Sequence, residues 1–116
     1  MDFLSIQGGS VKQGKMAELQ QWLAAHEPEL RDACPKGSEY VGTYVTIYGS
    51  EKGLGDVLTL IRMDSYGAQD ALAAAHGTRW GELVEEYVAF IDQSSTATDS
   101  NLLLKRLTDA TLWGDA

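Results

Sequence analysis

Residues 39–63 read EYVGTYVTIYGSEKGLGDVLTLIRM, and this stretch decides the fold class. Both ends are dense in β-branched and aromatic residues, which favour strands. A polar, glycine-rich connection over residues 49–55 separates them, as is typical of a hairpin. The stretch therefore predicts two antiparallel strands, over residues 39–48 and 57–63.

The first of these strands carries three tyrosines at even spacing. Because side chains alternate along a strand, regular alternation places Tyr40, Tyr44 and Tyr48 on one face. The opposite face is also apolar, so we expect both faces to be buried. Three phenols on one buried face need hydrogen-bond partners, which a ligand cavity or a subunit interface supplies.

Two segments before the hairpin have clear periodicity. Residues 3–7 alternate in the manner of a strand, and residues 12–33 carry apolar side chains at helical spacing. Pro28 removes one helical hydrogen bond, so we expect a kink or a restart near His26.

The segments after the hairpin predict a broken helix and one more strand. Asp64 or Ser65 can cap a helix that breaks at Gly77, and Thr78 can cap its restart. Residues 102–113 suit either a strand or a helix. We expect a strand, because β-α-β-β-α leaves a sheet that needs a fourth strand.

Length and composition indicate one folded domain over residues 1–116. The chain has 44% hydrophobic residues and a formal net charge of −8. Nucleic acids and anionic membranes recruit clustered Lys and Arg, which are scattered singly here apart from Lys105 and Arg106, so neither partner is expected. No signal peptide or membrane-spanning run is evident and Cys34 is the only cysteine, which predicts a cytoplasmic protein.

His76 and Trp80 are the most informative candidate site residues. They lie four residues apart, so on a continuous helix they share one face, where a titratable ring and an indole would line a cavity. The alternative is that Trp80 is core and His76 donates to a backbone carbonyl near Gly77. His26 is more simply a hydrogen-bonded structural histidine, and no metal-ligand spacing is present.

The order β-α-β-β-α-β, with residues 64–76 (DSYGAQDALAAAH) after the hairpin, resembles the dimeric α/β barrel superfamily. The antibiotic-biosynthesis-monooxygenase-like branch is the most similar. This resemblance implies an α+β, ferredoxin-like subunit with a four-stranded antiparallel sheet. It also implies that two subunits pair sheet against sheet into a barrel, with a small-molecule pocket between each sheet and its own helices.

The resemblance implies two functions that the sequence leaves open. One is cofactor-independent oxidation of an aromatic or quinol-type substrate, with His76 as the base and Tyr44 and Trp80 against the ligand. The other is a non-catalytic homodimeric binding or assembly module. Haem use is not expected, because the ligand histidine of haem-degrading relatives falls near Glu85 or Glu86, which we expect to face water. No cofactor is therefore predicted.

Overall fold

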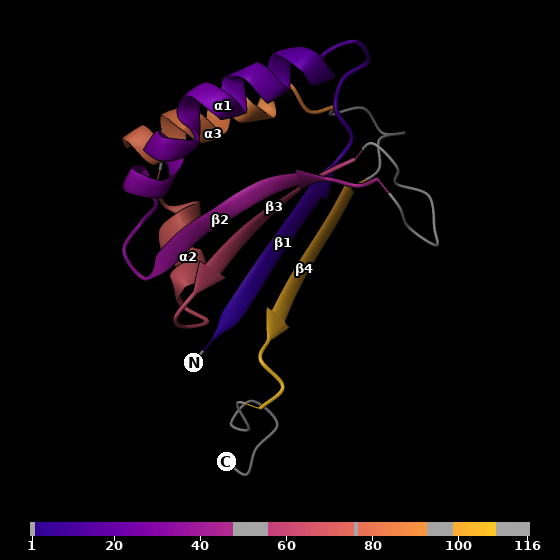
Figure 1. Cartoon of the computed structure of the whole chain (residues 1–116). Helices are drawn as coiled ribbons and strands as arrows, with labels where there is room; N and C mark the ends of the chain where they lie inside the picture. The colour runs from indigo at the N-terminus through magenta and orange to yellow at the C-terminus, as the bar shows by residue number, and fades with distance from the viewer. Residues whose placement is uncertain (1, 48–55, 76, 93–98, 109–116) are drawn as a thin grey trace.

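The computed structural model describes residues 2–47, 56–75, 77–92 and 99–108 (Figure 1). In this part of the chain the elements follow in the order β-α-β-β-α-α-β. Their bounds are β1 Phe3–Gly9, α1 Met16–Ala33, β2 Ser38–Val45, β3 Val57–Met63, α2 Ala68–Ala73, α3 Arg79–Val88 and β4 Asp99–Lys105. The hairpin and the existence of a final strand are confirmed, and the fold is α+β and ferredoxin-like. That strand begins three residues earlier than expected and ends at Lys105, and residues 109–113 of the predicted range lie outside the described residues.

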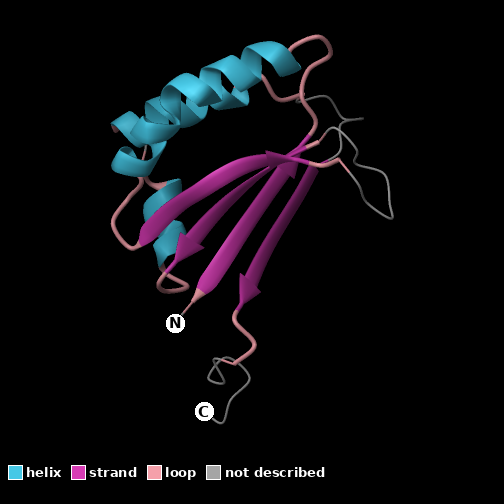
Figure 2. Ribbon diagram, viewed as in Figure 1, coloured by secondary structure: helices cyan, strands magenta, loops and turns pink. Residues whose placement is uncertain are grey.

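The four strands form one antiparallel sheet in the order β2-β3-β1-β4. All three helices lie on the same side of it, with α1 and α3 side by side along its length (Figure 2). Among the described residues no helix lies on the other side of the sheet. The sheet therefore has one covered face and one open face.

The break in the second helical region is confirmed. Gly77 adopts a positive φ of 81°, which glycine reaches without steric cost and which ends the first segment. Thr78 then caps α3, its hydroxyl accepting from the Gly81 amide at 3.2 Å. The cap expected at Asp64 or Ser65 is wrong, because α2 begins after Gly67 without a side-chain cap.

Helix α1 is one uninterrupted helix with Pro28 inside it, so no restart occurs. Its first residue is Met16, four positions later than the sequence predicts. The segment before it instead pairs with the chain after α3. Val11 forms a bridge with Ile91, and the Lys12 amide donates to the Phe90 carbonyl at 2.8 Å.

The core lies between the covered face and the helices. It consists of buried side chains from β1, β2, β3 and all three helices, namely Phe3, Leu30, Tyr40, Ile61, Met63, Ala68, Ala75, Trp80 and Leu83. Within the described residues no helix is long and apolar enough to cross a bilayer.

A β-bulge in β2 overturns the predicted face of the tyrosines. Tyr40 pairs with Ile61, but the next pair is Gly42 with Leu60, so one extra residue enters the strand. Tyr40 therefore points to the covered face and Tyr44 to the open face. Tyr44 is 55% exposed in the single chain, so burial of both faces of β2 requires a partner and stays a prediction. Tyr48 lies outside the described residues.

The open face is largely apolar and is bordered at one end by Arg62 and Glu39, which are in register beside Leu4. In register across the sheet lie Leu102, Ile6 and Leu60, and the next row places Leu104 beside Leu4. Leu102 is 54% exposed and Leu104 43%. We call this surface the open-face patch, and its members are Leu4, Ile6, Tyr44, Leu58, Leu60, Leu102 and Leu104.

Candidate functional site

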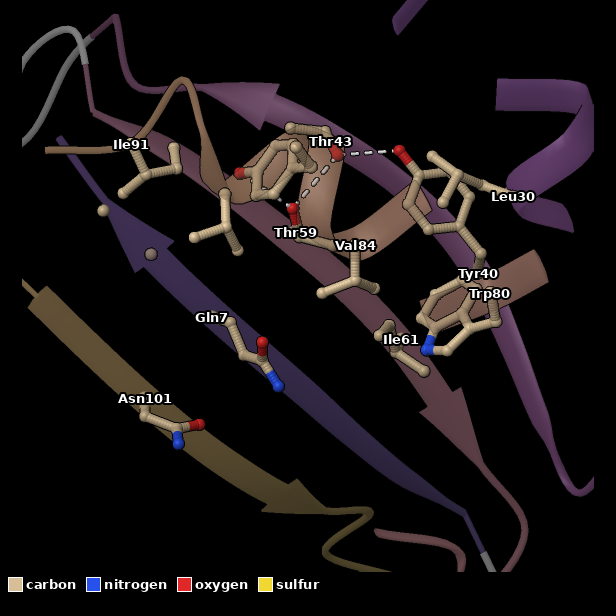
Figure 3. Close-up of a pocket in the computed structure, with 14 residues that line it drawn as sticks. Gln7, Leu30, Tyr40, Thr43, Thr59, Ile61, Trp80, Val84, Ile91 and Asn101 are labelled. Atoms are coloured by element: carbon tan, nitrogen blue, oxygen red, sulfur yellow. Dashed lines mark hydrogen bonds between the residues drawn. The ribbon is translucent and has the colours of Figure 1, made fainter. Parts of the chain in front are cut away.

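A cavity of about 220 Å³ lies between the covered face and the helices α1 and α3 (Figure 3). Its apolar wall comes from the sheet and both helices and consists of Leu30, Ile61, Trp80, Val84, Val88 and Ile91. Its polar groups are Gln7, Tyr40, Thr43, Thr59, Tyr87 and Asn101. An apolar body with a few placed polar groups is the general form of a small-molecule site.

Four hydroxyl groups in the cavity wall form a connected chain. Tyr40 Oη lies 2.7 Å from Thr43 Oγ1, which lies 3.1 Å from Thr59 Oγ1 (Figure 3). Thr59 donates to Tyr87 Oη at 3.3 Å. At the other end Tyr40 donates to the Glu27 carboxylate at 2.9 Å. We call this set the hydroxyl chain.

The bulge builds this chain. In regular alternation residues three apart face opposite ways, but the extra residue puts Thr43 on the same face as Tyr40. Thr43 is in register with Thr59 on β3, which brings their hydroxyls into contact. Helix α3 contributes Tyr87 above them.

Both phenols of the chain are held in their neutral form. Burial raises the pKa of Tyr40, and the neighbouring Glu27 carboxylate raises that pKa further, although the Thr43 hydroxyl opposes the shift. Burial also raises the pKa of Tyr87, and Thr59 opposes that shift. At neutral pH the chain therefore consists of hydroxyls that each donate one proton and accept others.

Two carboxamides lie toward the other edge of the cavity. Gln7 on β1 and Asn101 on β4 are register partners, and their side chains lie side by side on the covered face (Figure 3). Both are exposed, and neither has a side-chain hydrogen bond to the described residues. Each carboxamide offers a donor and an acceptor to a ligand.

A second hollow of about 320 Å³ adjoins the cavity beside α2. Gln7, Ile61, Trp80 and Val84 line both spaces, so the Trp80 indole stands between them. Substitution of Trp80 would therefore alter both spaces.

The residues singled out from sequence are placed differently by the structure. Trp80 is 6% exposed and lies in the cavity wall. Tyr44 lies on the opposite face of the sheet and does not line the cavity, so the structure does not bring it to Trp80. His76 lies outside the described residues, and its role stays a prediction.

Sequence reasoning missed the hydroxyl chain. Tyr87 had a usable signal, because it lies seven residues after Trp80 and so shares its helix face. Thr43 and Thr59 had none, since their contact depends on the bulge. Glu27 had none either, since its contact with Tyr40 depends on how α1 packs on the sheet.

Helix α1 is tied to α3 by polar contacts at their outer surface. Trp22 Nε1 donates to Glu86 at 2.9 Å, and Arg79 pairs with Glu29 at 2.9 Å. His26 Nδ1 lies 2.9 Å from the Trp22 carbonyl, which confirms the hydrogen-bonded histidine expected there. Glu85 and Glu86 are exposed, as predicted. Among the described residues no group of three or more His, Cys, Asp and Glu is arranged to hold a metal ion.

Comparison with known proteins identifies the fold. The sequence matches no family model and no curated protein. The structure is similar to a NIPSNAP family protein from Agrobacterium tumefaciens, at 16% identity and a TM-score of 0.62, over 97% of this chain and 99% of that one. A NIPSNAP domain protein from Burkholderia xenovorans gives 13% identity and a TM-score of 0.64, over 93% and 97%.

A candidate antibiotic biosynthesis monooxygenase from Deinococcus radiodurans is also similar, at 17% identity and a TM-score of 0.57, over 90% of this chain and 91% of that one. The chain thus shares the ferredoxin-like fold of these proteins, as the sequence resemblance predicts. The NIPSNAP-type structures were not anticipated from the sequence. At these identities the likeness establishes the fold and leaves the chemistry open.

Proposed function

We propose that this chain is a small-molecule-binding domain whose cavity takes an aromatic ligand of one or two rings. The cavity of about 220 Å³ carries the proposal, since it joins an apolar wall to hydroxyls and carboxamides. A cavity of about 150 Å³ accommodates benzene, whereas drug-sized ligands occupy about 300 Å³ or more. The volume therefore favours a ligand between these sizes.

The finer proposal is oxidation of a phenol or quinol by molecular oxygen without a cofactor. In such a reaction one atom of O₂ becomes a carbonyl oxygen at a ring C–H carbon, which gives a quinone, and the second oxygen atom leaves as water with the hydrogens of that C–H and of the phenol O–H. The substrate supplies all the electrons, so the protein must bind it, help remove a proton and exclude water. His76 is the proposed base, and the fold shared with the candidate monooxygenase supports this chemistry by analogy.

The binding experiment uses tryptophan fluorescence. Titration with 1-naphthol should quench the Trp80 emission saturably, because the ligand would lie against that indole. A Trp80→Phe variant should lose this component, while a Trp22→Phe variant, altered at the outer contact between α1 and α3, should retain it. Absence of saturable quenching in the wild-type chain would rule out the proposed cavity ligand.

Oxygen consumption separates the enzyme from a binding module. With a quinol substrate, an enzyme consumes oxygen faster than the uncatalysed control, and a His76→Ala variant loses the excess. If the chain is a binding module, the ligand quenches its tryptophan fluorescence, but oxygen consumption does not exceed that of the uncatalysed control.

We also propose that two copies of the chain pair through the open-face patch. Such a homodimer is compatible with an enzyme and with the non-catalytic assembly module. A soluble monomer rarely leaves so many neighbouring apolar side chains uncovered. A second copy presents the same patch, so a two-fold pairing covers both at once. Sedimentation as a stable 12.6 kDa monomer at micromolar concentration would contradict this pairing.

A cytoplasmic location is the last part of the proposal. Cys34 is a free thiol in the structure, as a reducing compartment allows. Cell fractionation tests it directly.

A further inference from the structure

We propose that the cavity binds a ligand hydroxyl in preference to a ligand carbonyl, and that Glu27 sets this preference from outside the cavity. The inference rests on the proposed function and deepens it by naming the ligand's polar group. It assigns the site to phenols or quinols rather than to ketones or quinones. Glu27 is then a positioning residue that acts through the hydroxyl chain.

The first step is that the hydroxyl chain joins the cavity to Glu27. All four hydroxyl-bearing side chains line the cavity, whereas Glu27 does not. The chain crosses three elements, from Tyr87 on α3 through β3 and β2, and it ends at the carboxylate on α1. None of its contacts is longer than 3.3 Å.

The second step is a count of protons. Each hydroxyl has one proton to donate, and a carboxylate has none. Tyr40 donates its proton to Glu27, and Thr59 donates its proton to Tyr87. Thr43 lies between Tyr40 and Thr59, and its single proton can fill only one of these two contacts. One of the two Thr43 contacts therefore lacks a proton in this arrangement. The Tyr87 proton is meanwhile available to a ligand oxygen.

The third step is that rotation of hydroxyl hydrogens fills the missing contact. If every hydroxyl donates toward Glu27, all four contacts hold a proton. The two Thr43 contacts allow either direction, whereas the contact of Thr59 with Tyr87 must reverse, so the Tyr87 phenol has to tilt to become the donor. Tyr87 then donates to Thr59 and turns a lone pair toward the cavity. A ligand hydroxyl can donate to that lone pair, so it is bound with the chain fully paired.

A ligand carbonyl has the opposite requirement. It only accepts, so it needs the Tyr87 proton and returns the chain to the arrangement with one empty contact. An unmade buried hydrogen bond weakens binding, and this loss is what the affinity ratio below measures. The ligand hydroxyl is therefore favoured for as long as the carboxylate terminates the chain.

The test compares two ligands of nearly equal size and shape. 1-Naphthol carries a hydroxyl, and 1-tetralone carries a carbonyl at the same position of a ten-carbon frame. Tryptophan quenching gives the affinity for each ligand, and from these the ratio of the 1-naphthol affinity to the 1-tetralone affinity. We expect this ratio to be roughly tenfold higher in the wild-type chain than in a Tyr87→Phe variant. The ratio of two affinities in one cavity is insensitive to a general loss of stability.

Two variants test the role of Glu27. Glu27→Gln ends the chain in an amide that can donate or accept, and Thr43→Val interrupts the chain at nearly constant volume. In each variant the ratio of the 1-naphthol affinity to the 1-tetralone affinity should fall close to that of Tyr87→Phe. Glu18→Gln removes the same charge from α1 outside the chain and should keep the tenfold preference.

The outcomes separate this inference from the function on which it rests. An affinity ratio in the wild-type chain equal to that of Tyr87→Phe, or a ratio in Glu27→Gln or Thr43→Val that stays at the wild-type value, overturns the inference but leaves the aromatic site in place. Failure of both ligands to bind overturns the proposed function and the inference with it.

Discussion

Tyr40 and Tyr44 are four residues apart in one strand, yet they lie on opposite faces of the sheet. The bulge between Tyr40 and Gly42 is the cause, since it shifts the alternation by one residue. Tyr40 thereby joins the hydroxyl chain. Tyr44 folds over Gly42, where an added Cβ would lie only 3.2 Å from its ring. One inserted residue thus gives the cavity its Thr43 hydroxyl and the open-face patch its Tyr44 ring.

Substitution of Leu60 by Lys should dissociate the proposed dimer. Leu60 lies in the middle of the open-face patch, in register with Ile6, and an ammonium group there would be buried without a partner on pairing. Sedimentation should show the variant as a monomer at concentrations where the wild-type chain is dimeric. Leu107→Lys, at a position 91% exposed beyond β4, serves as a charge-matched control and should leave the dimer intact. A dimeric Leu60→Lys variant would place the interface elsewhere.

Loss of the Thr78 cap should destabilise α3. The Thr78 hydroxyl accepts from the Gly81 amide, and removing such a cap costs about 1 kcal/mol. Urea denaturation of Thr78→Ala should therefore show a lower midpoint with an unchanged slope. Thr78→Ser keeps the hydroxyl and should recover most of the loss. Equal effects of the two substitutions would mean that the methyl group matters more than the cap.

The thiol of Cys34 should react slowly for a cysteine. Burial raises the pKa of Cys34 from 9.0 to about 11, so at pH 8 its thiolate fraction is about a hundredfold lower than that of an unperturbed thiol. The rate of reaction with a disulfide reagent should rise steeply between pH 8 and pH 11. The urea-unfolded chain provides the reference rate. Similar rates in the folded and unfolded chains at pH 8 would contradict the burial of this thiol.

Stability should fall in alkaline solution because of the two buried phenols. The pKa values of Tyr40 and Tyr87 are raised by burial, so above pH 10 the unfolded chain releases these protons more readily than the folded chain does. Their contribution is therefore complete below pH 10 and is lost as pH rises above it. Urea unfolding from pH 8 upward measures the decline, and Tyr87→Phe should make it shallower. Tyr66→Phe, at an exposed tyrosine, should not change it.

Much of the fold was readable from local sequence because it depends on local interactions. Alternation over residues 3–7 and 57–63 predicted β1 and β3, and the glycine-threonine step predicted where the second helical region breaks. These signals work because backbone conformation and helix capping involve residues close together in the chain. The need for a fourth strand followed from the order of the others.

The candidate site depended on contacts between distant segments. Whether Tyr40 shares a face with Tyr44 or with Thr43 is decided by how β2 pairs with β3. Gly42 is a local signal, because an isolated glycine inside a strand can indicate a bulge, but it does not fix which residue is inserted. The contact between Tyr40 and Glu27 depends in turn on how α1 crosses the sheet. By itself, the sequence determined the kinds and order of the elements. Only the tertiary structure decided which polar groups meet in the cavity, because strand register and helix packing are set by the whole core.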